Sequence, residues 1–267
     1  MVKILDCTIR DGGFQNNWDF SDDCVRDTFL VAHSCGVEFF EIGYRKSCGS
    51  RFEKCKAEDL QSLIQAKGST KLVVMLNSRD FSEELFFQDD FVDAVRVACH
   101  PDEIEQGINY CSYLKVLGYE TILHLMDVAN LSENHLKLLR KYDKESLLYF
   151  ADSYGTILPQ NVKEFFNILK HQGFKKIGFH AHNNKQLAFI NTLTAIDCGA
   201  YSVDVTAYGM GRAAGNTPAE LLLSEIGRPY SAYLKLIEKY YLDLYRKNPW
   251  GYSLKNLQGG ISNSKVI

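Results

Sequence analysis

The feature that most constrains the fold is the regular alternation of short apolar runs with amphipathic stretches along the 267 residues. Apolar runs of strand length recur eight times, and helix-like segments separate them. We expect strands at residues 2–7, 37–42, 71–76, 91–96, 120–125, 147–151, 176–181 and 202–207. We expect helices at residues 21–35, 56–68, 102–117, 132–143, 159–172, 184–198 and 217–227. Strands that alternate with helices pair in parallel through right-handed crossovers.

Eight such units favour an α/β fold of the closed (β/α)8 TIM-barrel type, which takes about 250 residues. The competing fold is an open doubly wound sheet, which usually carries a glycine-rich dinucleotide loop after its first strand. The segment Arg10-Asp11-Gly12-Gly13-Phe14 is no such loop. We therefore expect a TIM-barrel catalytic domain at residues 1–227 and a short C-terminal helical extension and tail at residues 228–267. This aromatic-rich extension could pack on the barrel, act as a lid or form a homodimer interface.

Composition excludes several other classes of protein. The chain has 30 basic and 33 acidic residues and a net charge of -3, so we expect no nucleic-acid partner. No apolar run approaches the roughly 18 residues of a membrane span, and we see no signal peptide. The eight cysteines form no CxxC pair, which is typical of reduced thiols and predicts a cytoplasmic protein.

Polar and titratable side chains gather where the expected strands end, which is where barrel enzymes place their active sites. In chain order these candidates are Arg10, Asp11, Glu41, Tyr44, Arg45, His124, Asp152, Ser153, Tyr154, His180, His182, Thr206, Tyr208 and Asn216. The pattern predicts a catalytic mouth at one end of the barrel.

The strongest single signal in this set is His180-x-His182 at the end of the seventh strand. Residues i and i+2 of a strand face the same side, so the two imidazoles are placed to share one ion. Barrel closure brings Asp11 and Asn216 beside them from adjacent strands. Two nitrogen and one or two oxygen ligands suit a divalent metal with open positions for substrate. We favour Mn²⁺ or Mg²⁺, and Co²⁺ or Zn²⁺ would also fit.

Arg10 places a second cation beside the predicted metal. This makes sense if the substrate is an anion that gains negative charge during the reaction, because a guanidinium donates in a planar fork to carboxylate or enolate oxygens. A plain Arg-Asp pair in a surface turn is the alternative.

Taken together, these residues resemble the DRE-TIM metallolyase superfamily, which includes 4-hydroxy-2-oxovalerate aldolase, hydroxymethylglutaryl-CoA lyase and the isopropylmalate and homocitrate synthases. The resemblance spans roughly residues 1–227. It rests on Asp6-x-Thr8-x-Arg10-Asp11-Gly12, Glu41-x-Gly43, Asp152-Ser153-x-Gly155, His180-Ala181-His182-Asn183 and Gly209-x-Gly211-x-x-Ala214-Gly215-Asn216-x-Pro218-x-Glu220. It implies that Asp11, His180 and His182 bind the divalent cation with Asn216 close by, and that Arg10 stabilises an enolate. The opening and the Asn-x-Pro-x-Glu ending look most like the aldolase-type members.

Three departures from the family pattern concern the rest of the chemistry. The aldolases carry a histidine used as general base where this chain has Phe14. The lyases carry a cysteine in the loop after strand 8, and residues 209–216 contain none. The synthases have Glu where this chain has Gly13. The base is therefore open among Tyr44, His124, Tyr154 and Tyr208, or a metal-bound water.

The resulting hypothesis is an aldolase or lyase that acts on a carbon–carbon bond of a 4-hydroxy-2-oxo acid through a pyruvate-type enolate. Its small-molecule partners would be a 2-oxo acid and an aldehyde. We expect substrate contacts from Arg10, Glu41, Arg45, Asp152, Ser153 and Thr206, and an aldehyde pocket shaped by Asn16, Asn17 and Trp18. The alternatives are a synthase that condenses an acyl-CoA with a 2-oxo acid, and an impaired barrel that acts with a partner.

Overall fold

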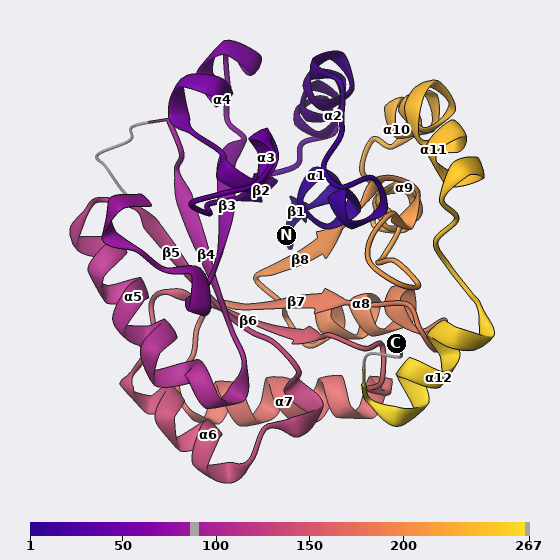
Figure 1. Ribbon diagram of the computed structural model, residues 1–267. Coiled ribbons are helices and arrows are strands. Elements are labelled where there is room, and N and C mark those ends of the chain that lie inside the picture. The colour runs from indigo at the N-terminus through magenta and orange to yellow at the C-terminus, as the bar shows by residue number, and fades with distance from the viewer. Residues whose placement is uncertain (86–90, 265–267) are drawn as a thin grey trace.

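A computed structural model describes residues 1–85 and 91–264 and shows a closed barrel of eight parallel strands in chain order (Figure 1). The last strand pairs with the first, which closes the sheet. The strands are β1 (Lys3–Asp6), β2 (Phe39–Tyr44), β3 (Lys71–Asn77), β4 (Ala94–Cys99), β5 (Glu120–Leu125), β6 (Leu147–Asp152), β7 (Ile177–Ala181) and β8 (Ser202–Val205). The predicted TIM barrel is therefore confirmed.

Helices surround the strands and make the outer layer of the barrel (Figure 1). They are α1 (Thr8–Gly12), α2 (Asp22–Ser34), α3 (Arg51–Lys54), α4 (Ala57–Leu63), α5 (Ile104–Val116), α6 (Glu133–Leu138), α7 (Pro159–His171), α8 (Ala188–Asp197) and α9 (Ala219–Glu225). Local sequence explains their starts: the Ser21 hydroxyl accepts from the Cys24 amide at the N-terminus of α2, and Pro159 opens α7. No helix among the described residues is both long and apolar enough to cross a membrane.

Two regions differ from the sequence-based prediction in ways that affect the site. Strand β4 lies three residues later than expected and begins directly after Asp93. The Asp93 backbone forms hydrogen bonds with Leu72 and Glu120, and its carboxylate accepts from Lys67. The shift moves Arg96 from the strand end into its middle. After β1 the chain turns at once into α1, so Arg10 and Asp11 lie on a short helix and not in an open loop.

The barrel interior has an apolar layer below a polar one. The lower layer is a buried cluster that includes Leu5, Phe39, Val73, Ile122 and Tyr149. Above it lie charged side chains that are almost completely buried, among them Glu41, Arg96 and Asp204. Charged groups are buried in this way only when they are paired, so the upper layer indicates a functional or structural ion network.

The C-terminal region forms helices that pack on the barrel, on the sides of α2 and α8 (Figure 1). The first part of the predicted helical extension consists of α10 (Ser231–Leu236), a π-helical turn (Ile237–Tyr241) and α11 (Leu242–Lys247). In the predicted tail, Leu254–Ser262 forms α12, and Asn184 of the loop after β7 donates to the Asn256 carbonyl at 2.8 Å.

A buried hydrogen bond fastens this region to the first strand. The Tyr233 hydroxyl donates to Asp6 Oδ2 at 2.6 Å, and the pKa of that carboxyl is raised by burial to about 6. A carboxyl whose pKa is higher in the folded state than in the unfolded state stabilises the fold less as pH rises from about 4 to about 6.

We expect Tyr233→Phe to lower the free energy of unfolding by about 1–3 kcal/mol, because it removes a donor from a buried carboxyl. Urea unfolding at pH 5 and pH 7.5 measures this. The matched control is Tyr240→Phe, which removes a hydroxyl that donates to the partly buried carboxylate of Asp27. This control should lower the free energy of unfolding by less. Equal losses in the two variants would contradict the proposed role of the Asp6 contact.

Candidate active site

Three buried side chains converge at the C-terminal end of the barrel: Asp11, His180 and His182. The Nε2 atoms of the two histidines lie 3.3 Å apart, and one ligand atom from each of the three residues falls within 4.8 Å of the others. Burial lowers the pKa of His182 to about 3, so its imidazole is neutral. Burial would raise the pKa of Asp11, but Arg10 and the histidines outweigh it and hold that pKa well below its usual range. The set therefore offers two imidazoles and a carboxylate.

The loop after β8 completes this cluster through Asn216. Its backbone forms an isolated antiparallel bridge with His182, and its Nδ2 donates to Asp11 Oδ2 and to the Met210 carbonyl. Gly211 permits the close approach, since a Cβ there would lie 2.2 Å from Asn216 Nδ2. The Asn216 Oδ1 atom is buried and has no partner among the described residues.

This donor set fits a divalent cation. Two imidazole nitrogens, a carboxylate and an unpartnered amide oxygen are ligands that such ions accept while keeping positions open for substrate. The structure brings together all four residues that the sequence named as metal ligands.

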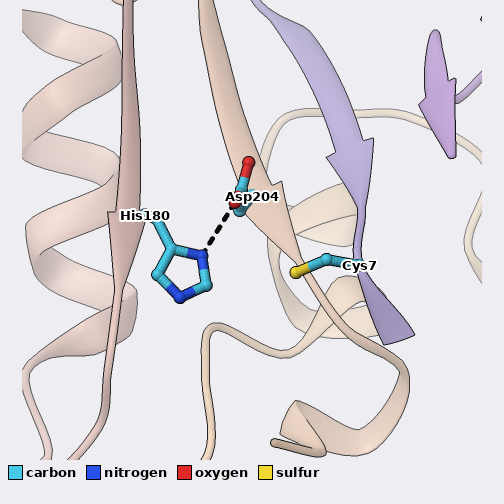
Figure 2. A group of neighbouring side chains, drawn as sticks. All are labelled: Cys7, His180 and Asp204. Atoms are coloured by element: carbon cyan, nitrogen blue, oxygen red, sulfur yellow. Dashed lines mark hydrogen bonds and ion pairs between the residues drawn. The ribbon is translucent and has the colours of Figure 1, made fainter. Parts of the chain in front are cut away.

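A second group that could hold an ion consists of Cys7, His180 and Asp204 and shares His180 with the first. Figure 2 shows its three side chains. Three of its atoms already have partners: Asp204 Oδ2 accepts from Arg96 NH1 and from His180 Nδ1, each at 2.7 Å, and the Cys7 thiol donates to the Val205 carbonyl. The Asp204 Oδ1 atom has no hydrogen-bond partner among the described residues. Burial raises the pKa of Cys7 well above its usual value, which keeps the thiol protonated. Because His180 uses its Nδ1 proton on Asp204, its Nε2 lone pair faces His182.

A continuous chain of ion pairs supports the cluster from below. Arg10 donates to Asp11 Oδ1 at 2.8 Å and to Glu41 Oε2 at 2.6 Å. Arg96 donates to both oxygens of Glu41 and to Asp204. Two guanidinium groups thus face three carboxylates, and this residual negative charge suits a bound cation. Sequence reasoning missed Arg96 and Asp204, although charged residues inside expected barrel strands were the available signal.

A cavity of about 340 Å³ opens above these residues. Of the residues that the sequence singled out, its lining includes Arg10, Asp11, Tyr44, His124, Ser153, His180 and His182. The lining also includes polar residues that sequence reasoning did not name, namely Lys46, Asn77, Arg79, Asp80, His100, Glu103 and Arg212. A cavity with converging polar groups of this size is typical of a small-molecule site.

The other predicted substrate-binding residues do not line this cavity. Glu41 lies beneath Arg10 as its counter-ion, and Arg45 donates to the Leu85 carbonyl at 3.2 Å. Asp152 accepts from the amides of Thr156 and Ile157 and so holds the loop after β6; burial raises its pKa to about 7. Thr206 is buried behind the site, where its amide donates to the Thr217 carbonyl.

The candidates for the general base also include residues that line the cavity and residues that do not. Tyr154 is not part of the cavity lining, and Tyr208 packs against Tyr245 and Trp250 outside it. Tyr44 and His124 do line the cavity. Burial raises the pKa of Tyr44 to about 12, so the phenol stays protonated, and burial together with Arg96 lowers the pKa of His124 well below its usual value.

Phe14 lies at the mouth, packed edge-on against the rings of Trp18 and Tyr44 with centroid distances of 4.7 and 6.3 Å. The Trp18 indole donates to the Arg10 carbonyl at 3.0 Å. A Cβ on Gly13 would lie 2.1 Å from the Trp18 ring, so this position has no room for a side chain.

Known proteins match this chain in sequence and in structure. Residues 120–230 match the family described as HMGL-like. The chain is 30% identical over 239 residues to a 4-hydroxy-2-oxovalerate aldolase of Geobacillus genomosp. 3, an alignment that covers 85% of this chain and 71% of the relative. It is 27% identical to an oxaloacetate decarboxylase of Mycobacterium tuberculosis, over 84% of this chain and 70% of the relative.

The chain belongs to the HMGL-like family of DRE-TIM metallolyases. The crystal structure of the N-terminal domain of a candidate aldolase from Bacteroides vulgatus superposes with a TM-score of 0.90 at 30% identity, covering 99% of this chain and 94% of that one. The HMG-CoA lyase of Brucella melitensis shares the fold, with a TM-score of 0.72 at 14% identity over 92% of this chain and 99% of its own. The chain is therefore a member of a lyase family, as the sequence motifs predicted.

Single substitutions of His182 and Cys7 distinguish which of the two ligand groups binds the metal. We expect His182→Ala to lose bound divalent metal, because it removes one of two nitrogen ligands, and Cys7→Ser to retain it, because the thiol already donates to Val205. Metal analysis of dialysed protein and titration with Mn²⁺ measure both. Unchanged metal content in His182→Ala, or loss in Cys7→Ser, would contradict the assignment.

Proposed function

We propose that this enzyme is a divalent-metal-dependent aldolase that cleaves or forms a carbon–carbon bond of a 4-hydroxy-2-oxo acid. The observation that carries the proposal is the buried cluster of Asp11, His180 and His182 with a partly unsatisfied guanidinium, Arg10, beside it in one cavity. The 4-hydroxy-2-oxovalerate aldolase relatives support the same substrate class.

Asp11, His180, His182 and Asn216 would hold the ion, for which we favour Mn²⁺ or Mg²⁺. When bound, such an ion supplies Lewis acidity to the carboxylate and keto oxygens of a 2-oxo acid. The structure supports this assignment through the His180–Asp204 hydrogen bond, which fixes the imidazole with Nε2 toward the cluster.

Arg10 is held for a second task. Its Nε donates to Glu41 and its NH1 to Asp11, while its NH2 is buried without a partner among the described residues. A donor fixed in this way before the reaction can bind the oxygen on which negative charge develops. We assign it to the enolate oxygen.

In the cleavage direction, the proton of the C4 hydroxyl leaves, the C3–C4 bond breaks and an aldehyde departs. The bonding electron pair passes into the enolate of pyruvate or a homologue, which takes a proton at C3. Tyr44 and His124 line the cavity as a protonated phenol and a neutral imidazole, and we assign them as donors to substrate oxygens.

The acceptor of the hydroxyl proton differs from that of the aldolases that the chain resembles, because Phe14 stands at the histidine position. Outside the histidine pair and the buried His124, the imidazole of the cavity lining is His100, which follows β4. We propose His100 as this acceptor. Its position became visible only when β4 was placed three residues later than the sequence indicated.

We expect the Mn²⁺-loaded enzyme to release pyruvate from a 4-hydroxy-2-oxo acid, and Arg10→Gln to lower kcat by about 10²–10³-fold because it removes a fixed donor to the developing oxyanion. A coupled lactate dehydrogenase assay measures pyruvate, and metal content with circular dichroism shows that the variant is loaded and folded. A folded, loaded Arg10→Gln enzyme with unchanged kcat would remove Arg10 from the mechanism.

A second candidate reaction is decarboxylation of a 2-oxo diacid such as oxaloacetate. The apolar Phe14 favours it, because loss of CO₂ forms the same enolate without removal of a hydroxyl proton. The oxaloacetate decarboxylase relative also supports it.

Comparison of the two substrates separates these functions. We expect a higher kcat/KM for the 4-hydroxy-2-oxo acid than for oxaloacetate, measured as pyruvate release, with His182→Ala and free Mn²⁺ as blanks for spontaneous decarboxylation. The reverse order, with CO₂ and pyruvate formed in equal amounts from oxaloacetate, would replace the aldolase proposal with the decarboxylase.

A further inference from the structure

The cations that line the cavity differ in how their charge is compensated. Arg10 is paired with Asp11 and Glu41, Lys46 with Glu53 at 3.2 Å, and Arg79 with Glu103. The guanidinium of Arg212 forms no hydrogen bond and no ion pair within the described parts of the chain, and its charge interacts with the Asp11 carboxylate only through space.

The loop after β8 presents this side chain in a defined way. Arg212 follows Gly211, which packs directly against the Asp11–Asn216 pair and whose carbonyl accepts a hydrogen bond from the Gln15 side chain. The next residue, Ala213, has a φ of 55°, and the Gly215 amide donates back to the Arg212 carbonyl at 3.0 Å. The backbone on both sides of Arg212 is therefore held.

The charge stands over an aromatic surface at the mouth. The Arg212 guanidinium carbon lies 5.7 Å from the centroid of Phe14, and that ring packs against Trp18 and Tyr44. Lys46 Nζ lies 4.7 Å from the Tyr44 centroid, so a second cation borders the same aromatic group. Arg10 and the histidines lie in the buried part of the cavity, whereas Phe14 is 41% exposed.

We propose that Arg212 binds a second anionic group of the substrate, a carboxylate or a phosphate, at the end of the molecule remote from the 2-oxo acid. The 2-oxo acid end already has Arg10 and the predicted metal ligands, so an unpaired guanidinium at the rim serves the other end. A guanidinium binds either oxyanion through two parallel hydrogen bonds. The aromatic surface beneath it suits the carbon chain between the two ends.

This inference rests on the proposed function for the orientation of the substrate and deepens it: the aldehyde product would itself carry an acid group. Such a preference distinguishes the enzyme from one that cleaves a substrate with a neutral methyl end. The apolar residue at position 14 then belongs to the path along which the chain of the substrate lies.

The test uses pairs of ligands that cannot be cleaved because they lack the C4 hydroxyl. Isothermal titration of the Mn²⁺-loaded protein compares 2-oxoglutarate with 2-oxopentanoate, which has the same chain length but a neutral end. A third ligand, 2-oxo-4-phosphonobutyrate, distinguishes the phosphate class from the carboxylate class. We expect tighter binding of one of the anionic ligands than of 2-oxopentanoate in the wild-type protein.

In Arg212→Gln we expect this preference to fall about tenfold or more, the loss typical of a charge-assisted pair. Arg26→Gln, which removes an exposed charge from the outer helix α2, is the matched control and should keep the preference. Arg212→Lys should keep part of it, since it retains the charge and loses the planar fork.

Equal binding of neutral-ended and anionic ligands by the wild-type protein, or an unchanged preference in Arg212→Gln, would overturn the proposal. The binding readout is independent of turnover. An Arg212-dependent preference without any cleavage of 4-hydroxy-2-oxo acids would therefore remove the proposed aldolase reaction and leave the subsite standing.

Discussion

The site depends on Arg96, a guanidinium buried in the middle of the barrel. It joins Glu41 of β2 to Asp204 of β8 across the interior, and its guanidinium carbon lies 4.9 Å from the centroid of the Tyr149 ring. Removal of one partner from a buried ion network costs about 3–5 kcal/mol, because an uncompensated charge remains in a medium of low dielectric constant. The network is therefore a fixed part of the folded barrel, and it holds the side chains of Arg10 and His180 in place.

Two functional side chains take their orientation from this network. Glu41 binds both Arg96 and Arg10, so the carboxylate that neutralises the core also aims Arg10 toward the cavity. Asp204 binds both Arg96 and His180, and thereby selects the imidazole tautomer that leaves Nε2 free. One buried arginine thus positions the group that we assign to the enolate and one of the groups that we assign to the ion.

The centre and the outer part of the cavity are formed by different parts of the barrel. The fold places Asp11 and the histidine pair close together at the end of the barrel, and Phe14 and Trp18 pack against each other at the mouth of the cavity. The outer part of the cavity is instead formed by residues of the loops after β2, β3, β4 and β8, including Lys46, Arg79, His100 and Arg212. Loops of this kind are where TIM-barrel enzymes vary their substrates.

The sequence by itself determined the barrel and the centre of its site. Eight alternating units leave few other topologies, and two histidines at i and i+2 of a strand must face the same side. Only the tertiary structure decided which of the remaining polar residues take part. Arg45 and Tyr154 stand next to residues that line the cavity but do not line it themselves, and Arg45 instead donates to the Leu85 carbonyl. The ion-pair partners of Arg96 and Asp204 and the place of His100 in the cavity lining were decided only by barrel closure, since the register of β4 and the pairing of β8 with β1 depend on contacts far apart in the chain.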